Sequence, residues 1–128
     1  MAGVGKPNNV ISIPTSFDNF FKYWFNFLKP FHKMTDREID VISALLRKRY
    51  ALSKVVQDRV LLEKITLSDD TKREVREECG LSPAHFQLIL SKLKKKGAIS
   101  DSGINPKFIP KLTDKGDHFQ LLLLFTFK

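Results

Sequence analysis

The chain has 128 residues, enough for one domain with its own hydrophobic core and too few for two. Its 22 Lys and Arg against 14 Asp and Glu give a formal charge of +8, which favours a polyanionic partner such as nucleic acid, although lysines that only keep a small domain in solution explain the same charge. The one cysteine, Cys79, excludes an intramolecular disulfide and a thiolate zinc site, and fits a reducing setting.

No segment has the character of a secretory signal or of a membrane span. Residues 1–7 contain one Lys and no long apolar run. The longest uninterrupted apolar stretch, Leu121 to Phe125, has five residues, whereas a helix that crosses a bilayer needs about 20. We therefore expect a cytoplasmic chain without a membrane partner.

Residues 1–15 predict an extended N-terminal arm. The first nine are rich in Gly, Pro and Asn, a composition typical of turns. Val10 to Ile13 alternates weakly and is stopped by Pro14, which indicates a short strand or an extended peptide that leans on a neighbour.

Residues 16–33 predict an aromatic helix that packs on the core. Ser16 or Thr15 is the expected N-cap, and Pro30 closes the segment. The apolar side chains of the helix spread over roughly 200° of the circumference. Because this is wider than one core-facing stripe, either the helix is unusually well buried or part of it docks on a second chain. The expected partner-interface residues are Phe17, Phe20, Trp24 and Phe27, with Leu122 and Leu124 from a final strand that is apolar on both faces.

Helix signals continue from Thr35 to Cys79. Thr35 and Glu38 form a capping-box pattern that starts a long helix, and Arg47-Lys48-Arg49 at its end complements the negative end of the helix dipole. After Leu52 a possible short helix contains Val55, Val56, Val60 and Leu61. Ser68 offers the cap for a further helix that runs to Cys79.

The segment from Thr71 to Leu93 carries the spacing of two helices that cross at a tight turn. Gly80 is the turn residue, and apolar residues lie five and one before it and one, six and nine after it. These positions are Val75, Cys79, Leu81, Phe86 and Ile89. Ser82 supplies an N-cap, Pro83 suits the first helical position, and Gly97 is the expected left-handed C-cap.

This spacing resembles the winged helix-turn-helix superfamily, and the chain resembles small phage-encoded members of it, over residues 34–128. The resemblance implies one mainly α domain of the α+β class, with a C-terminal β-hairpin wing and the aromatic helix in front of it. We expect a turn at Ser100 to Gly103, a strand at 107–112, a turn at 114–117 and a strand at 118–127. Pro106 and Pro110 limit the middle strand to an edge. One departure is Arg76, where the motif usually has Ala.

The first functional hypothesis is duplex DNA binding by the second helix of the motif, in a regulatory or nucleic-acid-organising role. Between Lys92 and Lys115 there are seven Lys against two Asp. The expected groove residues are Gln87, Ser91, Lys92 and Lys95, and the expected phosphate contacts are Lys94, Lys96, Lys107 and Lys111. No Arg, the usual guanine reader, lies on this helix.

The alternative hypothesis is a structural or assembly component, for example of a phage virion, that uses the domain to contact protein. The exposed Leu88 in the middle of the proposed DNA face fits that hypothesis equally well. An enzyme is the weakest option, because His32, His85 and His118 lack metal-ligand spacing and Cys79 occupies an apolar position. We expect no catalytic residues, no metal and no cofactor.

Overall fold

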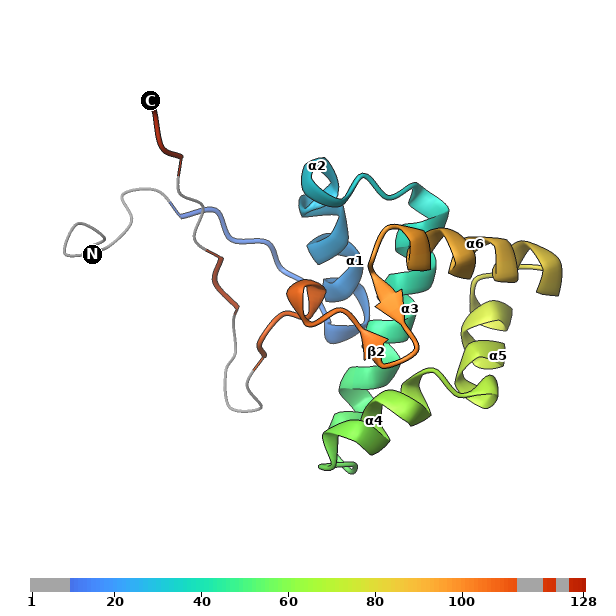
Figure 1. Cartoon of the computed structure of the whole chain (residues 1–128). Coiled ribbons are helices and arrows are strands. Elements are labelled where there is room, and N and C mark those ends of the chain that lie inside the picture. Colours follow the sequence, from blue (N-terminus) through green and yellow to red (C-terminus); the bar gives the residue numbers. More distant parts are fainter. Residues whose placement is uncertain (1–9, 113–118, 122–124) are drawn as a thin grey trace.

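A computed structural model of the chain describes residues 10–112, 119–121 and 125–128. Within these ranges the fold is mainly helical with one small antiparallel sheet, as expected of the α+β class. The elements, in chain order, are α1 (Phe17–Phe27), α2 (Lys29–His32), α3 (Asp36–Ser53), α4 (Arg59–Thr66), α5 (Asp69–Glu78), α6 (Pro83–Lys95), β1 (Ile99–Ser100), β2 (Gly103–Ile104) and the 3-10 helix η1 (Pro106–Phe108) (Figure 1).

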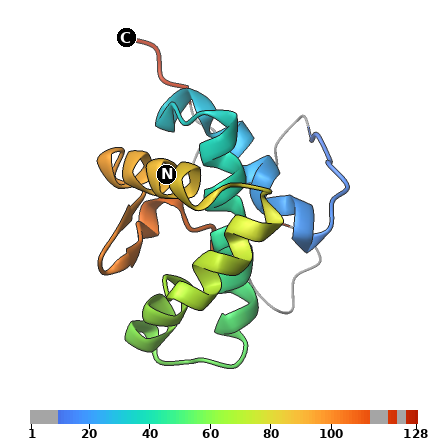
Figure 2. The ribbon, with the colours of Figure 1, turned by 90° about the vertical axis from the view of Figure 1, so that its right-hand side faces the viewer.

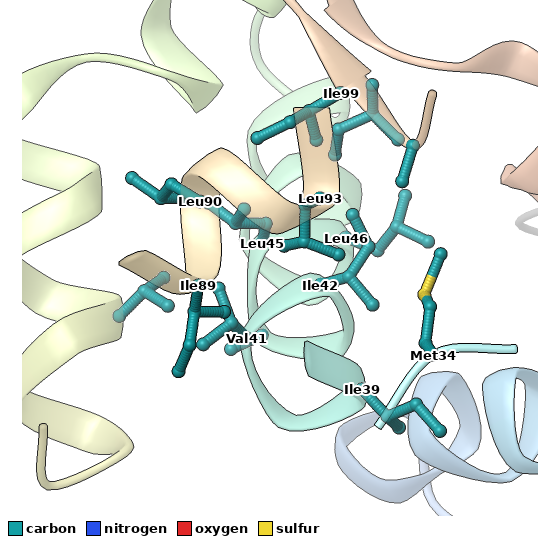
Figure 3. Packing of buried hydrophobic residues seen from close by; sticks show 14 of the residues in the cluster. Met34, Ile39, Val41, Ile42, Leu45, Leu46, Ile89, Leu90, Leu93 and Ile99 are labelled. Carbon is teal, nitrogen blue, oxygen red and sulfur yellow. The ribbon is translucent and has the colours of Figure 1, made fainter. Parts of the chain in front are cut away.

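Helix α3 is the centre of the fold, with α1, α4, α5 and α6 packed around it. It begins as the capping-box pattern predicts: the Glu38 N–H donates to the Thr35 hydroxyl at 3.2 Å, and the Thr35 N–H donates to the Glu38 carboxylate at 3.0 Å. Residues 41–46 are all buried, so this part of α3 is covered on every side. Figure 3 shows its aliphatic side chains meeting those of α6, around Leu45 and Leu93.

The cationic run Arg47-Lys48-Arg49 of α3 has partners on two other helices. Arg47 pairs with Glu78 of α5, Lys48 with Glu74 of α5 at 3.2 Å, and Arg49 with Glu63 of α4 at 2.5 Å. The dipole effect expected for this run is wrong, because α3 continues to Ser53 and its last turn contains no basic residue. The ion pairs instead join α4 and α5 to α3. They also turn two carboxylates of α5 toward α3.

The turn between α5 and α6 is the one that the spacing predicts. Gly80 has φ +66°, a left-handed conformation that suits Gly, and Ser82 caps α6 by accepting the His85 N–H at 3.2 Å. Gly97, with φ +75°, follows the end of α6. Arg76 donates a hydrogen bond from Nη1 to the Leu81 carbonyl at 3.2 Å, so this unusual residue fastens the turn.

The sheet lies earlier in the chain than expected. Ile99 pairs with Ile104 and Ser100 with Gly103, and the connection is Asp101-Ser102. Gly103 has φ +129°, and the side chain of Glu63 packs so closely on it that an added Cβ would lie 2.4 Å from Oε2.

The strands expected at 107–112 and 118–127 are wrong for the described residues. Pro106 starts η1 instead, because the Asn105 side chain accepts the Lys107 N–H at 3.0 Å and turns the chain there. Residues 119–121 and 125–128 are not in a strand, since no neighbouring strand offers them backbone partners. The turn expected at 114–117 lies outside the described residues.

Three smaller expectations also need correction. Pro30 does not end the helical segment, because it fits the first turn of the new helix α2. Val55 and Val56 lie in the connection before α4, which starts only where Asp58 caps it by accepting the Leu61 N–H at 3.1 Å. Of the two alternatives for residues 10–13, the strand is wrong, because the segment has no regular secondary structure and is exposed.

The described terminal segments and α5–α6 lie on different sides of α3. In Figure 1 the segments around residues 10–15 and 125–128 project beyond α1, away from α6. Figure 2, turned by 90°, has α5 and α6 toward the viewer and these segments behind. The molecule therefore has an α6 side and an α1 side.

Candidate nucleic-acid interface on helix α6

Helix α6 has one apolar side and one polar side. Its inner residues Phe86, Ile89, Leu90 and Leu93 are buried against α3 and the rest of the core. At about 100° per residue, the positions opposite them must face outward. The structure confirms this, because every other residue of α6 is exposed, and Figure 2 shows the helix at the surface.

The four expected groove residues share this outer side. Gln87, Ser91, Lys92 and Lys95 are all exposed on α6, and no Asp or Glu lies anywhere on the helix. Neither Lys92 nor Lys95 forms an ion pair with a residue in the described ranges. Leu88 lies among them and is 53% exposed. The outer side of α6 is therefore a cationic surface with an apolar residue at its middle.

Lys94 lies at the flank of this surface. Its ammonium group is 3.8 Å from the carboxylate of Asp101 at the tip of the hairpin, in a pair exposed to solvent. A shallow hollow of about 210 Å³ opens here between α5, α6 and β1, with Lys72 and Ile99 in its wall. Asp101 gives the hairpin tip a negative charge, so the tip itself supplies no cation for a phosphate.

Lys96 has a different role from the one expected. Its ammonium group donates to the buried carboxylate of Glu38 at 2.5 Å and to the carbonyl of Lys33 at 3.0 Å. Burial alone raises the pKa of Glu38, but the hydrogen bonds from Lys96 and the Thr35 N–H outweigh it and hold the pKa below its ordinary value. Lys96 thus joins the end of α6 to the start of α3, and its charge is not free for a phosphate.

Lys107 and Lys111 lie away from α6. Lys107 belongs to η1, which packs on the α1 side: the Trp24 indole N–H donates to the Phe108 carbonyl at 2.9 Å, and the Phe108 ring lies 6.3 Å from that of Phe25. Lys111 follows three residues after the end of η1. Both are exposed, but the structure does not join them to the cationic surface of α6.

The expected partner-interface residues of α1 divide into two groups. Phe20 and Trp24 are partly buried and hold the Phe119 ring between them, at centroid distances of 5.4 and 5.5 Å. Phe17 and Phe27 remain about half exposed, and Phe17 stacks on Tyr50 at 5.1 Å. Leu122 and Leu124 lie outside the described residues.

Two exposed aromatic residues, Tyr23 and Phe31, were not assigned to this interface from the sequence. Both belong to the set of apolar residues that spreads over roughly 200° of the predicted helix. The width of that apolar surface could have indicated that they face outward beside Phe27. The packing of the Phe119 ring on Phe20 and Trp24 could not be predicted from the sequence, because these residues are almost one hundred positions apart.

His32 and Cys79, which were considered as catalytic or metal-binding residues, make hydrogen bonds to the backbone within the fold. His32 is buried; its Nδ1 accepts the Met34 N–H at 3.0 Å, so its Nε2 must be the donor to the Phe25 carbonyl at 2.6 Å. Burial raises the pKa of the Cys79 thiol, which contacts the Asp40 carbonyl at 3.8 Å. In residues 10–112, 119–121 and 125–128, no group of three or more His, Cys, Asp or Glu is placed to hold a metal ion.

Comparison with models of protein families, with curated proteins and with solved structures finds no match for the chain. Within the described part, no helix has the length and apolar character needed to cross a bilayer. A function must therefore be inferred from the geometry and charge described above.

Proposed function

We propose that the chain is a DNA-binding protein of the winged helix-turn-helix type that presents the outer side of α6 to duplex DNA. The observation that carries the proposal is the cationic surface of α6, where Lys92 and Lys95 have no described ion-pair partner and Gln87 and Ser91 lie beside them. The second helix of such a motif enters the major groove with its exposed side toward the bases. The short hairpin of β1 and β2 directly after α6 supports the proposal, because a wing is a β-hairpin that follows the second helix of the motif.

The surface favours phosphate binding over base reading. Gln87 is suited to an adenine edge and Ser91 to several bases, but α6 has no Arg for a bidentate contact with guanine. Leu88 can contact only a thymine methyl. We therefore expect affinities that differ little between unrelated duplexes and fall steeply with salt.

Fluorescence anisotropy with a labelled duplex, at several salt concentrations, tests this proposal. Lys92 and Lys95 border the groove, from where their long side chains also reach phosphates. Replacing both by Glu should therefore make the slope of log K against log salt shallower by about 2, with at least about a tenfold loss of affinity. The matched control replaces Arg59 and Lys64 by Glu, which changes the net charge equally on the exposed part of α4. Equal loss in the two variants, or no salt-dependent binding by the unaltered chain, would contradict the proposal.

A structural or assembly role is the second candidate, and the exposed aromatic residues of the α1 side favour it. Tyr23, Phe27 and Phe31 offer apolar contact area on the side away from α6. If this were the whole function, charge reversal on α6 would leave all binding unchanged. The same anisotropy series therefore distinguishes the two candidates.

A further inference from the structure

The outer face of α1 and α2 carries aromatic side chains without cover. Tyr23 and Phe27 are 50% and 47% exposed, and Phe31 is 74% exposed. They continue the surface on which Phe20 and Trp24 hold Phe119. Soluble monomers rarely leave large apolar side chains together in water, so this face indicates a contact.

The C-terminal segment carries a second set of uncovered aromatic residues. Beyond Phe119, Phe125 and Phe127 are 78% and 96% exposed. At these exposed fractions neither ring packs on its own copy, and Figure 1 shows the C-terminal end of the chain projecting away from α1 and α2. The chain thus shows both an uncovered apolar face and an uncovered apolar segment.

Both lysines of α1 and α2 have an ion-pair partner on α3. Lys22 of α1 pairs with Asp40 at 3.0 Å, and Lys29 of α2 pairs with Asp36 at 2.8 Å. The lysine-rich side of α6 lies elsewhere on the molecule. Two copies can therefore approach through their α1 sides without bringing their main cationic surfaces together.

The exposed area matches what a stable dimer needs. An aromatic side chain offers about 150–250 Å², so Phe17, Tyr23, Phe27, Phe31, Phe125 and Phe127, at their exposed fractions, offer on the order of 800 Å². A standard interface buries about 800 Å² on each partner. The aromatic residues alone therefore supply one side of such an interface.

We propose that a second copy of this chain covers this face, with Phe125 and Phe127 of each copy packing on the exposed rings of α1 and α2 of the other. Exchange of identical segments between copies is a common route to two-fold dimers.

Light scattering coupled to size-exclusion chromatography tests the dimer on the full chain. We expect a mass of two copies of 14.7 kDa for the unaltered protein. Replacing Phe27 and Phe31 by Ser, or Phe125 and Phe127 by Ser, should give monomers, because all four side chains are largely exposed and contribute little to the monomer core. Circular dichroism verifies that both variants remain folded. The matched control, Val55 and Val60 to Ser, removes one exposed apolar side chain from the connection before α4 and one from the first turn of α4, and should stay dimeric.

Mixing the two monomeric variants tests the exchange itself. The variant altered at 27 and 31 keeps an intact C-terminal segment, and the variant altered at 125 and 127 keeps an intact helix face. One intact pair of surfaces is then available, so the mixture should regain a dimer that neither variant forms alone. A monomeric unaltered chain, a dimer unaffected by either pair of substitutions, or a mixture that stays monomeric would overturn the proposal. DNA binding is not used in these measurements, so they do not depend on the function proposed above.

Discussion

Replacing Lys96 by Met should weaken the fold at neutral pH. The Glu38 side chain is 2% exposed and accepts hydrogen bonds from the Lys96 ammonium group at 2.5 Å and from the Thr35 N–H at 3.0 Å. Met keeps the aliphatic chain but removes the donor, which leaves a buried carboxylate without its counter-ion. Removing one partner of a fully buried pair costs about 3–5 kcal/mol; because the Lys96 side chain is 32% exposed, water compensates in part and we expect about 2 kcal/mol.

The cost of this substitution should depend on pH. Burial raises the pKa of Glu38, but the hydrogen bonds from Lys96 and Thr35 lower it by more than burial raises it. The pKa in the folded state therefore lies below the unfolded value of about 4.3. The stabilisation is therefore present above that unfolded value and is lost as the pH falls through the folded pKa. Without Lys96 the effect of burial is less opposed, so the folded pKa rises and the deficit of the variant shrinks in acid.

Urea unfolding followed by circular dichroism, at about pH 7 and about pH 4, measures both effects. Lys95→Met is the control, because it removes the same charge from the exposed side of α6 and should change stability by no more than about 0.5 kcal/mol. The reasoning is refuted if the two variants are equally stable at neutral pH, or if the deficit of Lys96→Met is the same in acid.

Two further pairs of substitutions test the packing of β2 on α4 and of α6 on the core. Gly103→Ala should cost about 2 kcal/mol in urea unfolding, because the position has φ +129° and the new Cβ would meet the ion-paired side chain of Glu63; Gly97→Ala, with positive φ but open space around it, should cost less. Leu93→Ala should cost about 2–5 kcal/mol because Leu93 is fully buried, whereas Leu88→Ala on the outer side should stay within about 0.5 kcal/mol. The packing described is contradicted if Gly103→Ala and Gly97→Ala lower the free energy of unfolding equally, or if Leu93→Ala and Leu88→Ala do.

Features that depend on near neighbours in sequence were predicted well. The Thr35 capping box, the turn at Gly80 and the cap at Ser82 each involve residues within a few positions of one another, so local rules determine them. The outward positions of Gln87 and Lys95 follow from helical periodicity once the inner side is known.

Features that depend on distant residues were not predictable. Lys96 and Lys95 are adjacent and chemically identical in the sequence, and only the position of Glu38, 58 residues earlier, distinguishes their roles. Lys107 follows α6 closely in the chain, but it lies in η1, where the neighbouring Phe108 carbonyl accepts the indole N–H of Trp24 from α1. The strands predicted at 107–112 and 118–127 were wrong, over their described residues, for the same reason. A strand needs a hydrogen-bonded neighbour, and alternation of apolar residues in the sequence does not identify that neighbour.

The separation of the buried and exposed sides of α6 determines which of its positions tolerate substitution. Buried side chains on its inner side and hydrogen bonds at its two ends hold this helix in place, so substitutions at the exposed positions 84, 87, 88, 91 and 95 should change stability little. The same scaffold can therefore present different chemical groups on this side while its interior stays as it is.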